Sequence, residues 1–165
     1  MQFLTLLVAT LSLVAAAISL PTEVDERAAK PTVTYDTVYD GKKHSLDIVA
    51  CSNGEHGLEH LGYKTFGSLP NFPYIGGAQA VKGWNSPKCG SCWQLTYKNR
   101  TVNILAVDHA QTGFNIDLEA MNKLTNNHAK ELGNVKVQAK EVARSACGLR
   151  PAPPHQTTDL PVLWT

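Results

Sequence analysis

Alternating apolar and polar residues predict strands in the second half of this chain. Residues 93–97 alternate strictly, residues 98–100 carry a turn signal, and residues 101–107 are mostly apolar. Because successive side chains of a strand point to opposite faces, this pattern predicts a β-hairpin whose second strand is central. A further alternation over residues 135–139 predicts a last strand.

Weaker strand signals precede the hairpin. Residues 33–39 are β-branched and aromatic and predict a first strand, and residues 47–50 predict a short second one. Residues 52–88 are rich in glycine and proline and cannot form one regular element throughout. Loops of this length in a compact domain are usually functional or specially anchored.

A helical period replaces the alternation after the hairpin. Apolar residues share one helical face over residues 115–124, with Asn115 or Asp117 available as the N-cap. A second helical turn over residues 128–132 ends at Gly133.

The two ends of the chain differ from this globular part. Residues 1–19 form an uncharged apolar run followed by small residues, the layout of a secretory signal peptide. A membrane anchor is the alternative, but the run barely reaches the roughly 20 residues that spanning requires. Residues 20–31 are expected to be a leader or flexible arm, and residues 150–165 a proline-rich disordered tail.

Composition limits the partners of the remaining single domain, residues 32–149. Lys and Arg total 15 against 14 Asp and Glu, and the basic residues form no run. The sequence therefore lacks the clustered basic residues that nucleic-acid binding requires. No other segment approaches membrane length, so no anchor is expected after signal removal. The low charge suits a surface that meets neutral ligands.

Four cysteines lie at Cys51, Cys89, Cys92 and Cys147. In a secreted chain an even number predicts two disulfides, and four cysteines allow three pairings. The Cys89-Gly-Ser-Cys92 motif is an alternative redox pair or half of a zinc site. It lacks a βαβ context and a second ligand pair, so two structural cysteines are expected, without metal or cofactor.

Asp108 is the first candidate for chemistry, because it stands where the buried strand meets a loop. It suits hydrogen bonding to sugar hydroxyls or proton transfer, and the alternative is a cap for the following turn. Glycoside hydrolysis requires a second carboxylate. The candidates are Asp36, Asp40, Asp47, Glu55, Glu59 and Asp117, and no motif marks any of them.

Aromatic side chains are the second candidates, because their rings suit sugar faces. Six are possible platforms, and most are expected in the core: Tyr35, Tyr39, Tyr63, Tyr74, Trp84 and Trp93. Tyr63 and Tyr74 lie in glycine-rich loops and are the better surface candidates. Separately, Asn99-Arg100-Thr101 is an N-glycosylation sequon at the expected hairpin tip.

Several motifs in one order resemble the cerato-platanin family, in particular its snodprot branch. They are Val33-Thr34-Tyr35-Asp36, the segments 50–58, 72–77, 83–87 and 89–93, Val107-Asp108-His109-Ala110, and Gly113-Phe114-Asn115. The order and spacing match from about Val33 to Leu149, and both ends of the chain extend beyond the family's usual limits.

The resemblance implies a mainly β fold, a six-stranded double-ψ β-barrel with short helices and the disulfides Cys51–Cys89 and Cys92–Cys147. It implies a secreted fungal elicitor or phytotoxin that binds chitin oligomers and loosens cellulosic material without hydrolysis, as expansins do. The family's shallow groove corresponds here to Asp108, Asn115, Tyr35, Ser52, Asn53 and Gly54. The expected partners are chitin or GlcNAc oligomers, cellulose-type polysaccharide and a plant surface receptor.

Overall fold

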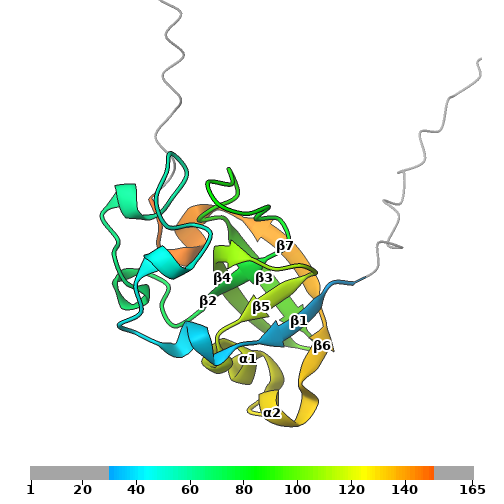
Figure 1. Ribbon diagram of the computed structural model, residues 1–165. Helices are drawn as coiled ribbons and strands as arrows, with labels where there is room; N and C mark the ends of the chain where they lie inside the picture. The colour runs from blue at the N-terminus through cyan, green and yellow to red at the C-terminus, as the bar shows by residue number, and fades with distance from the viewer. Residues whose placement is uncertain (1–29, 151–165) are drawn as a thin grey trace, which may run out of the picture.

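A seven-stranded curled sheet forms the centre of the computed structural model, which describes residues 30–150 (Figure 1). The strands are β1 (Thr32–Tyr35), β2 (Ile75–Ala78), β3 (Cys92–Tyr97), β4 (Arg100–His109), β5 (Phe114–Ile116), β6 (Asn134–Lys136) and β7 (Gln138–Val142). The helices are α1 (Leu118–Thr125) and α2 (Ala129–Leu132), with 3-10 turns η1 (Thr37–Asp40), η2 (Leu46–Ile48), η3 (Glu59–Leu61), η4 (Phe66–Ser68) and η5 (Arg144–Cys147). The predicted signal peptide, most of the predicted leader and nearly all of the predicted tail lie outside the described residues.

The strands follow the order β6-β1-β5-β2-β4-β3-β7, with β1 parallel to β5 and β2 parallel to β4. The edge strands β6 and β7 are neighbours in the chain, separated only by Val137. Nevertheless β6 pairs with β1 at one edge of the sheet and β7 pairs with β3 at the other. The sheet therefore curls until its two edges are joined by continuous chain (Figure 1). Val137 is buried and donates its N–H to Pro31 O, 3.0 Å away, which breaks the single last strand predicted here. The count is seven strands rather than the expected six.

The predicted hairpin is confirmed, since β3 and β4 pair antiparallel from Tyr97–Arg100 to Cys92–Leu105. The helical segments are confirmed as α1 and α2, with Asp117 rather than Asn115 as the N-cap and Gly133 ending α2. None of the helices within residues 30–150 has the length and apolar character that crossing a membrane requires.

Three segments differ from the prediction. The first strand, predicted over residues 33–39, ends at Tyr35, because the Asp36 carboxylate accepts the N–H of Val38 at 2.9 Å and begins the 3-10 turn η1. Residues 47–50 are no strand: the 3-10 turn η2 lies there, and the Ser45 hydroxyl accepts the N–H of Asp47. Strand β2 was missed because glycines usually weaken a strand. Here Gly76 lets β5 approach closely, since a Cβ at this position would lie 2.4 Å from Asn115 O.

The long loop zone is anchored by its apolar side chains and by the disulfides. Leu58 and Phe66 are fully buried and belong to the core with Ile75 and Leu105 of the sheet. The disulfides are Cys51–Cys89 and Cys92–Cys147, as the resemblance implied, with separations of 38 and 55 residues. In the chain-entropy model each contributes about 4 kcal/mol. All four cysteines are thereby paired, which excludes a free C-x-x-C thiol pair.

Two carboxyl groups meet at the N-terminus of α1, beneath the sheet in Figure 1. Asp117 Oδ1 accepts the N–H of Ala120 at 2.9 Å, and Asp40 Oδ1 accepts the N–H of Leu118 at 3.0 Å. Asp117 is only 1% exposed. Burial, and then a hydrogen bond with Asp40, raise the pKa of Asp117 to about 7. Asp117 therefore carries a proton in mildly acidic solution, because burial and Asp40 outweigh the backbone N–H groups of α1, which favour the ionised form.

Acid should stabilise this fold through Asp117. Between pH 3.8 and about 7 the folded state binds a proton that the unfolded state releases, so the free energy of unfolding falls as pH rises. The expected slope is at most about 1.4 kcal/mol per pH unit. Urea unfolding at several pH values across this window measures it. Asp117→Asn keeps an oxygen for Ala120 and does not titrate, so it should flatten the dependence. The same slope in both proteins would contradict this assignment.

Candidate functional site

A row of residues crosses four neighbouring strands at the end of β4. Thr34 of β1 pairs with Asn115 of β5, Asn115 with Gly77 of β2, and Gly77 with Asp108 of β4. Thr34 Oγ1 donates to Asn115 Oδ1 at 2.9 Å, so these two side chains lie on one face. Two strand spacings separate the backbones of Asn115 and Asp108, about 10 Å. The predicted site residues Asn115 and Asp108 therefore lie on either side of Gly77 in the sheet.

A β-bulge lies beside Asp108, because the pairing of β2 with β4 shifts between Gly76 and Gly77. Bulges bend a strand and re-aim its side chains. Gly77 has no room for a side chain, since a Cβ there would lie 2.9 Å from His109 O. The sequence signal for this bulge is the Gly76-Gly77 pair.

The Asp108 carboxylate joins three segments of the chain. Oδ1 accepts the N–H groups of Ala50 at 2.9 Å and His109 at 2.8 Å, and Oδ2 accepts the Tyr39 hydroxyl at 3.1 Å. A carboxylate has about four acceptor positions. One position on Oδ2 is therefore available to an external hydroxyl, and Asp108 is partly exposed.

Tyr39 is a permanent donor to this carboxylate. It is 3% exposed. Burial, and then the charge of Asp108 and the hydrogen bond to it, raise the pKa of the Tyr39 phenol well above its ordinary value. The phenol therefore keeps its proton. Sequence reasoning placed Tyr39 among the aromatic residues but missed its contact with Asp108, which bridges 69 positions of the chain.

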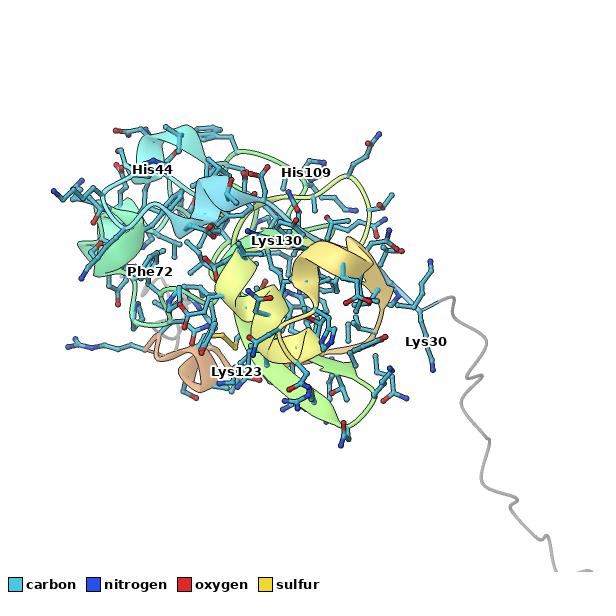
Figure 2. The ribbon with its side chains drawn as sticks, turned by 90° about the horizontal axis from the view of Figure 1, so that it is seen from below. Lys30, His44, Phe72, His109, Lys123 and Lys130 are labelled. Carbon is cyan, nitrogen blue, oxygen red and sulfur yellow. A yellow bond between two sulfur atoms is a disulfide. The ribbon has the colours of Figure 1, made fainter. Side chains whose placement is uncertain are left out.

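No carboxylate within residues 30–150 shares a hydrogen bond with Asp108, including the six candidate partners for hydrolysis. Asp117 and Asp40 are engaged at α1 instead. In Figure 2, His109, next to Asp108, lies on the opposite side of the view from Lys123 of α1. Of the six candidates, Asp36 is close enough for its charge, like that of Asp108, to raise the pKa of the Tyr39 phenol.

The predicted site residues 52–54 follow a segment that is hydrogen-bonded to β4 next to Asp108: the N–H of Cys51 donates to Val107 O at 3.0 Å. Ser52 is buried, at 5% exposure, so its side chain contributes little surface. Asn53 is exposed, and its Oδ1 accepts the indole N–H of Trp84 at 2.7 Å. Gly54 has φ +89°, where an added Cβ would lie 2.7 Å from Asn85 Oδ1.

Among the aromatic candidates, Trp84 is more exposed than Tyr63 and Tyr74, which were expected to be the better surface candidates. Tyr35, Tyr63 and Tyr74 are half-buried and pack against the core. Trp84 is 65% exposed. Sequence analysis expected most of these aromatic residues in the core. The available sequence signal at Trp84 was its turn-forming neighbours Gly83 and Asn85, and both have positive φ in the structure.

Comparison with known proteins places this chain among fungal relatives. Residues 31–149 match the family Cerato-platanin. The chain is 45% identical to the heat-stable 19 kDa antigen of Coccidioides immitis over 141 residues, which is 85% of this chain and 97% of the antigen. The crystal structure of cerato-platanin 1 from M. perniciosa is 44% identical and covers 71% of this chain and 98% of its own, with a TM-score of 0.69. The solution structure of cerato-platanin, described as a fungal elicitor, is 39% identical over 70% of this chain and 95% of its own, with a TM-score of 0.64. The chain therefore belongs to the cerato-platanin family.

Proposed function

We propose that this protein is secreted, binds chitin- or cellulose-type polysaccharides through the surface around Asp108, and loosens them without cutting glycosidic bonds. The observation that carries the proposal is the Asp108 carboxylate, held by three internal donors with one acceptor position left over. The apolar run at residues 1–19 and the two disulfides support secretion.

Loosening proceeds by competition for hydrogen bonds. A sugar hydroxyl that binds another glucan chain donates instead to Asp108 Oδ2, while Asn115, Tyr35 and Asn53 offer further polar contacts nearby. Each neutral exchange nets only about 0.5–1.5 kcal/mol. Binding at a single site is therefore weak and reversible, so one protein acts along many positions of a polymer.

A single fixed carboxylate supports loosening over hydrolysis. Glycosidases normally place two carboxyl groups on either side of the bond that they cut. If the protein were a hydrolase that uses Asp108, the second carboxyl group would have to come from a residue that does not hydrogen-bond to Asp108. Release of soluble sugar is therefore an outcome that the test below must exclude.

We also propose that the protein elicits plant defence or acts as a phytotoxin, through oligosaccharide partners or a plant surface receptor. The solved cerato-platanin described as a fungal elicitor supports this role. The parallel pairs β1–β5 and β2–β4 support a double-ψ β-barrel as the finer description of the curled sheet.

Asp108→Asn should reduce dispersion of cellulose or chitin particles. The amide oxygen still accepts the N–H of Ala50 and His109, so the fold is kept, but the sugar hydroxyl loses a charged acceptor. Hydrogen bonds to charged groups are stronger by about 1–1.5 kcal/mol, so we expect roughly tenfold weaker binding. Particle dispersion and reducing-sugar release are measured together on the same samples.

Tyr39→Phe is the matched control, because it removes one donor to Asp108 and leaves the carboxylate in place. It should lower the free energy of unfolding by about 1 kcal/mol and keep dispersion near the wild-type level. Unchanged dispersion by folded Asp108→Asn removes Asp108 from the mechanism. Steady sugar release by the wild-type protein replaces loosening with hydrolysis.

We propose that Asn99 carries an N-linked glycan. It is exposed in the two-residue turn between Tyr97 of β3 and Arg100 of β4. Protein secreted from a fungal host should lose mass after peptide N-glycosidase treatment. Asn99→Gln and Thr101→Ala should abolish that loss, whereas Thr101→Ser keeps the sequon and should retain it. Wild-type protein with the mass of the bare chain would contradict the assignment.

A further inference from the structure

Trp84 is an exposed indole that is held in one position. Its exposure, 65%, is the highest among the exposed large hydrophobic residues in the described part of the chain. Single exposed apolar residues are common on protein surfaces, so exposure alone assigns no role. The polar edge of this indole, however, is fixed, because Nε1–H donates to Asn53 Oδ1 at 2.7 Å.

The backbone around Trp84 is strained in a way that presents the ring. Gly83 has φ +141°, and Asn85 has φ +58°, a region that residues with side chains rarely adopt. Asn85 is held there by its Oδ1, which accepts the N–H of His56 at 2.8 Å. Such conformations persist only where the surroundings over-determine them, and they cluster at functional sites.

Gly54 packs closely against the indole and against Asn85. A Cβ at Gly54 would lie 3.2 Å from Trp84 Cζ2 and 2.7 Å from Asn85 Oδ1, so only glycine lets the two loops approach this closely. The Cys51–Cys89 disulfide ties the same two loops together. The indole is thus fixed by one hydrogen bond, one close contact and one covalent crosslink nearby.

The indole is also linked to the Asp108 site through the chain. Ala50 donates its N–H to Asp108, and Asn53, which holds Trp84, follows three residues later. Three residues span at most about 11 Å. Asp108 and the indole are therefore connected through one short segment of chain.

We propose that Trp84 is the stacking platform for a pyranose ring of a β-linked chitin or cellulose oligomer, with Asn53 as the residue that positions it. The proposal rests on the proposed polysaccharide binding and names the residue that supplies its apolar contact. The C–H face of the sugar lies on the negative face of the indole, and the fixed ring orders no further side chain on binding. Asp108 then accepts a hydroxyl from a neighbouring part of the oligomer.

The test is an NMR titration with chitotetraose and, separately, cellotetraose. Backbone amide signals around Asp108, which every variant keeps, report Kd, and the Trp84 indole N–H is a second reporter in the proteins that keep Trp84. Trp84→Leu keeps an exposed apolar side chain and removes the aromatic face. It should raise Kd by roughly 2- to 10-fold, the worth of one aromatic contact, and Trp84→Phe should recover part of the loss. The two sugars distinguish recognition of the N-acetyl group from recognition of the shared pyranose ring.

Two further variants separate stacking from other effects. Leu132→Ala changes an exposed apolar residue on α2 and should leave Kd unchanged. Asn53→Ala frees the indole, so it should weaken binding and broaden the indole signal, and Asn53→Asp, which keeps the acceptor oxygen, should restore both.

An unchanged Kd in Trp84→Leu, with wild-type binding intact, overturns the platform and leaves polysaccharide binding standing. A wild-type protein that binds neither sugar overturns both proposals together. If Trp84→Leu abolishes self-association in sedimentation and leaves Kd unchanged, the indole is a contact between copies of the chain, and the platform is again overturned.

Discussion

The hydrogen bonds of one carboxylate connect the parts of this protein that sequence distance keeps apart. Asp108 is the penultimate residue of β4, and its carboxylate accepts hydrogen bonds from Tyr39 of η1, from Ala50 and from His109 at the end of its own strand. Loss of this acceptor leaves the buried Tyr39 hydroxyl without a partner, which costs about 1–3 kcal/mol. Asp108 therefore has a structural role before it has any functional one, and a ligand meets a carboxylate whose position is already fixed.

Fixed groups matter because the proposed ligand offers little binding energy. Each ordered side chain costs about 0.5–1.5 kcal/mol when a ligand immobilises it, which is as much as a neutral hydrogen bond contributes. Here folding has already fixed the groups: three donors hold Asp108, Thr34 holds Asn115, and Asn53 holds Trp84. The Cys51–Cys89 disulfide fixes the two loops that carry the last pair. An open surface can bind a neutral polymer under these conditions.

Local sequence patterns predicted those parts of the fold that depend on neighbouring residues. The alternation in β3 and β4 is a local signal and predicted the hairpin, while the N-cap of α1 was narrowed to Asn115 or Asp117, of which the structure has Asp117. Strand β2 was missed, because its glycines make sense only against the backbone of β5. The site was predictable as a set of motif residues through family resemblance. The contact of Tyr39 with Asp108, and the exposure of Trp84, depend on residues far apart in the chain and required the structure.

The two aspartates with distinctive surroundings also bear on the choice between loosening and cutting. A glycosidase needs a carboxyl group that keeps its proton near neutral pH and a second, ionised one, both within reach of the substrate. Asp117 meets the first condition, with a pKa raised to about 7, but it is 1% exposed and caps α1. Asp108 reaches the surface, and its contacts are two backbone amides and a phenol. The same burial that raises the pKa of Asp117 removes it from any substrate, and Asp108 is left as an acceptor of hydrogen bonds.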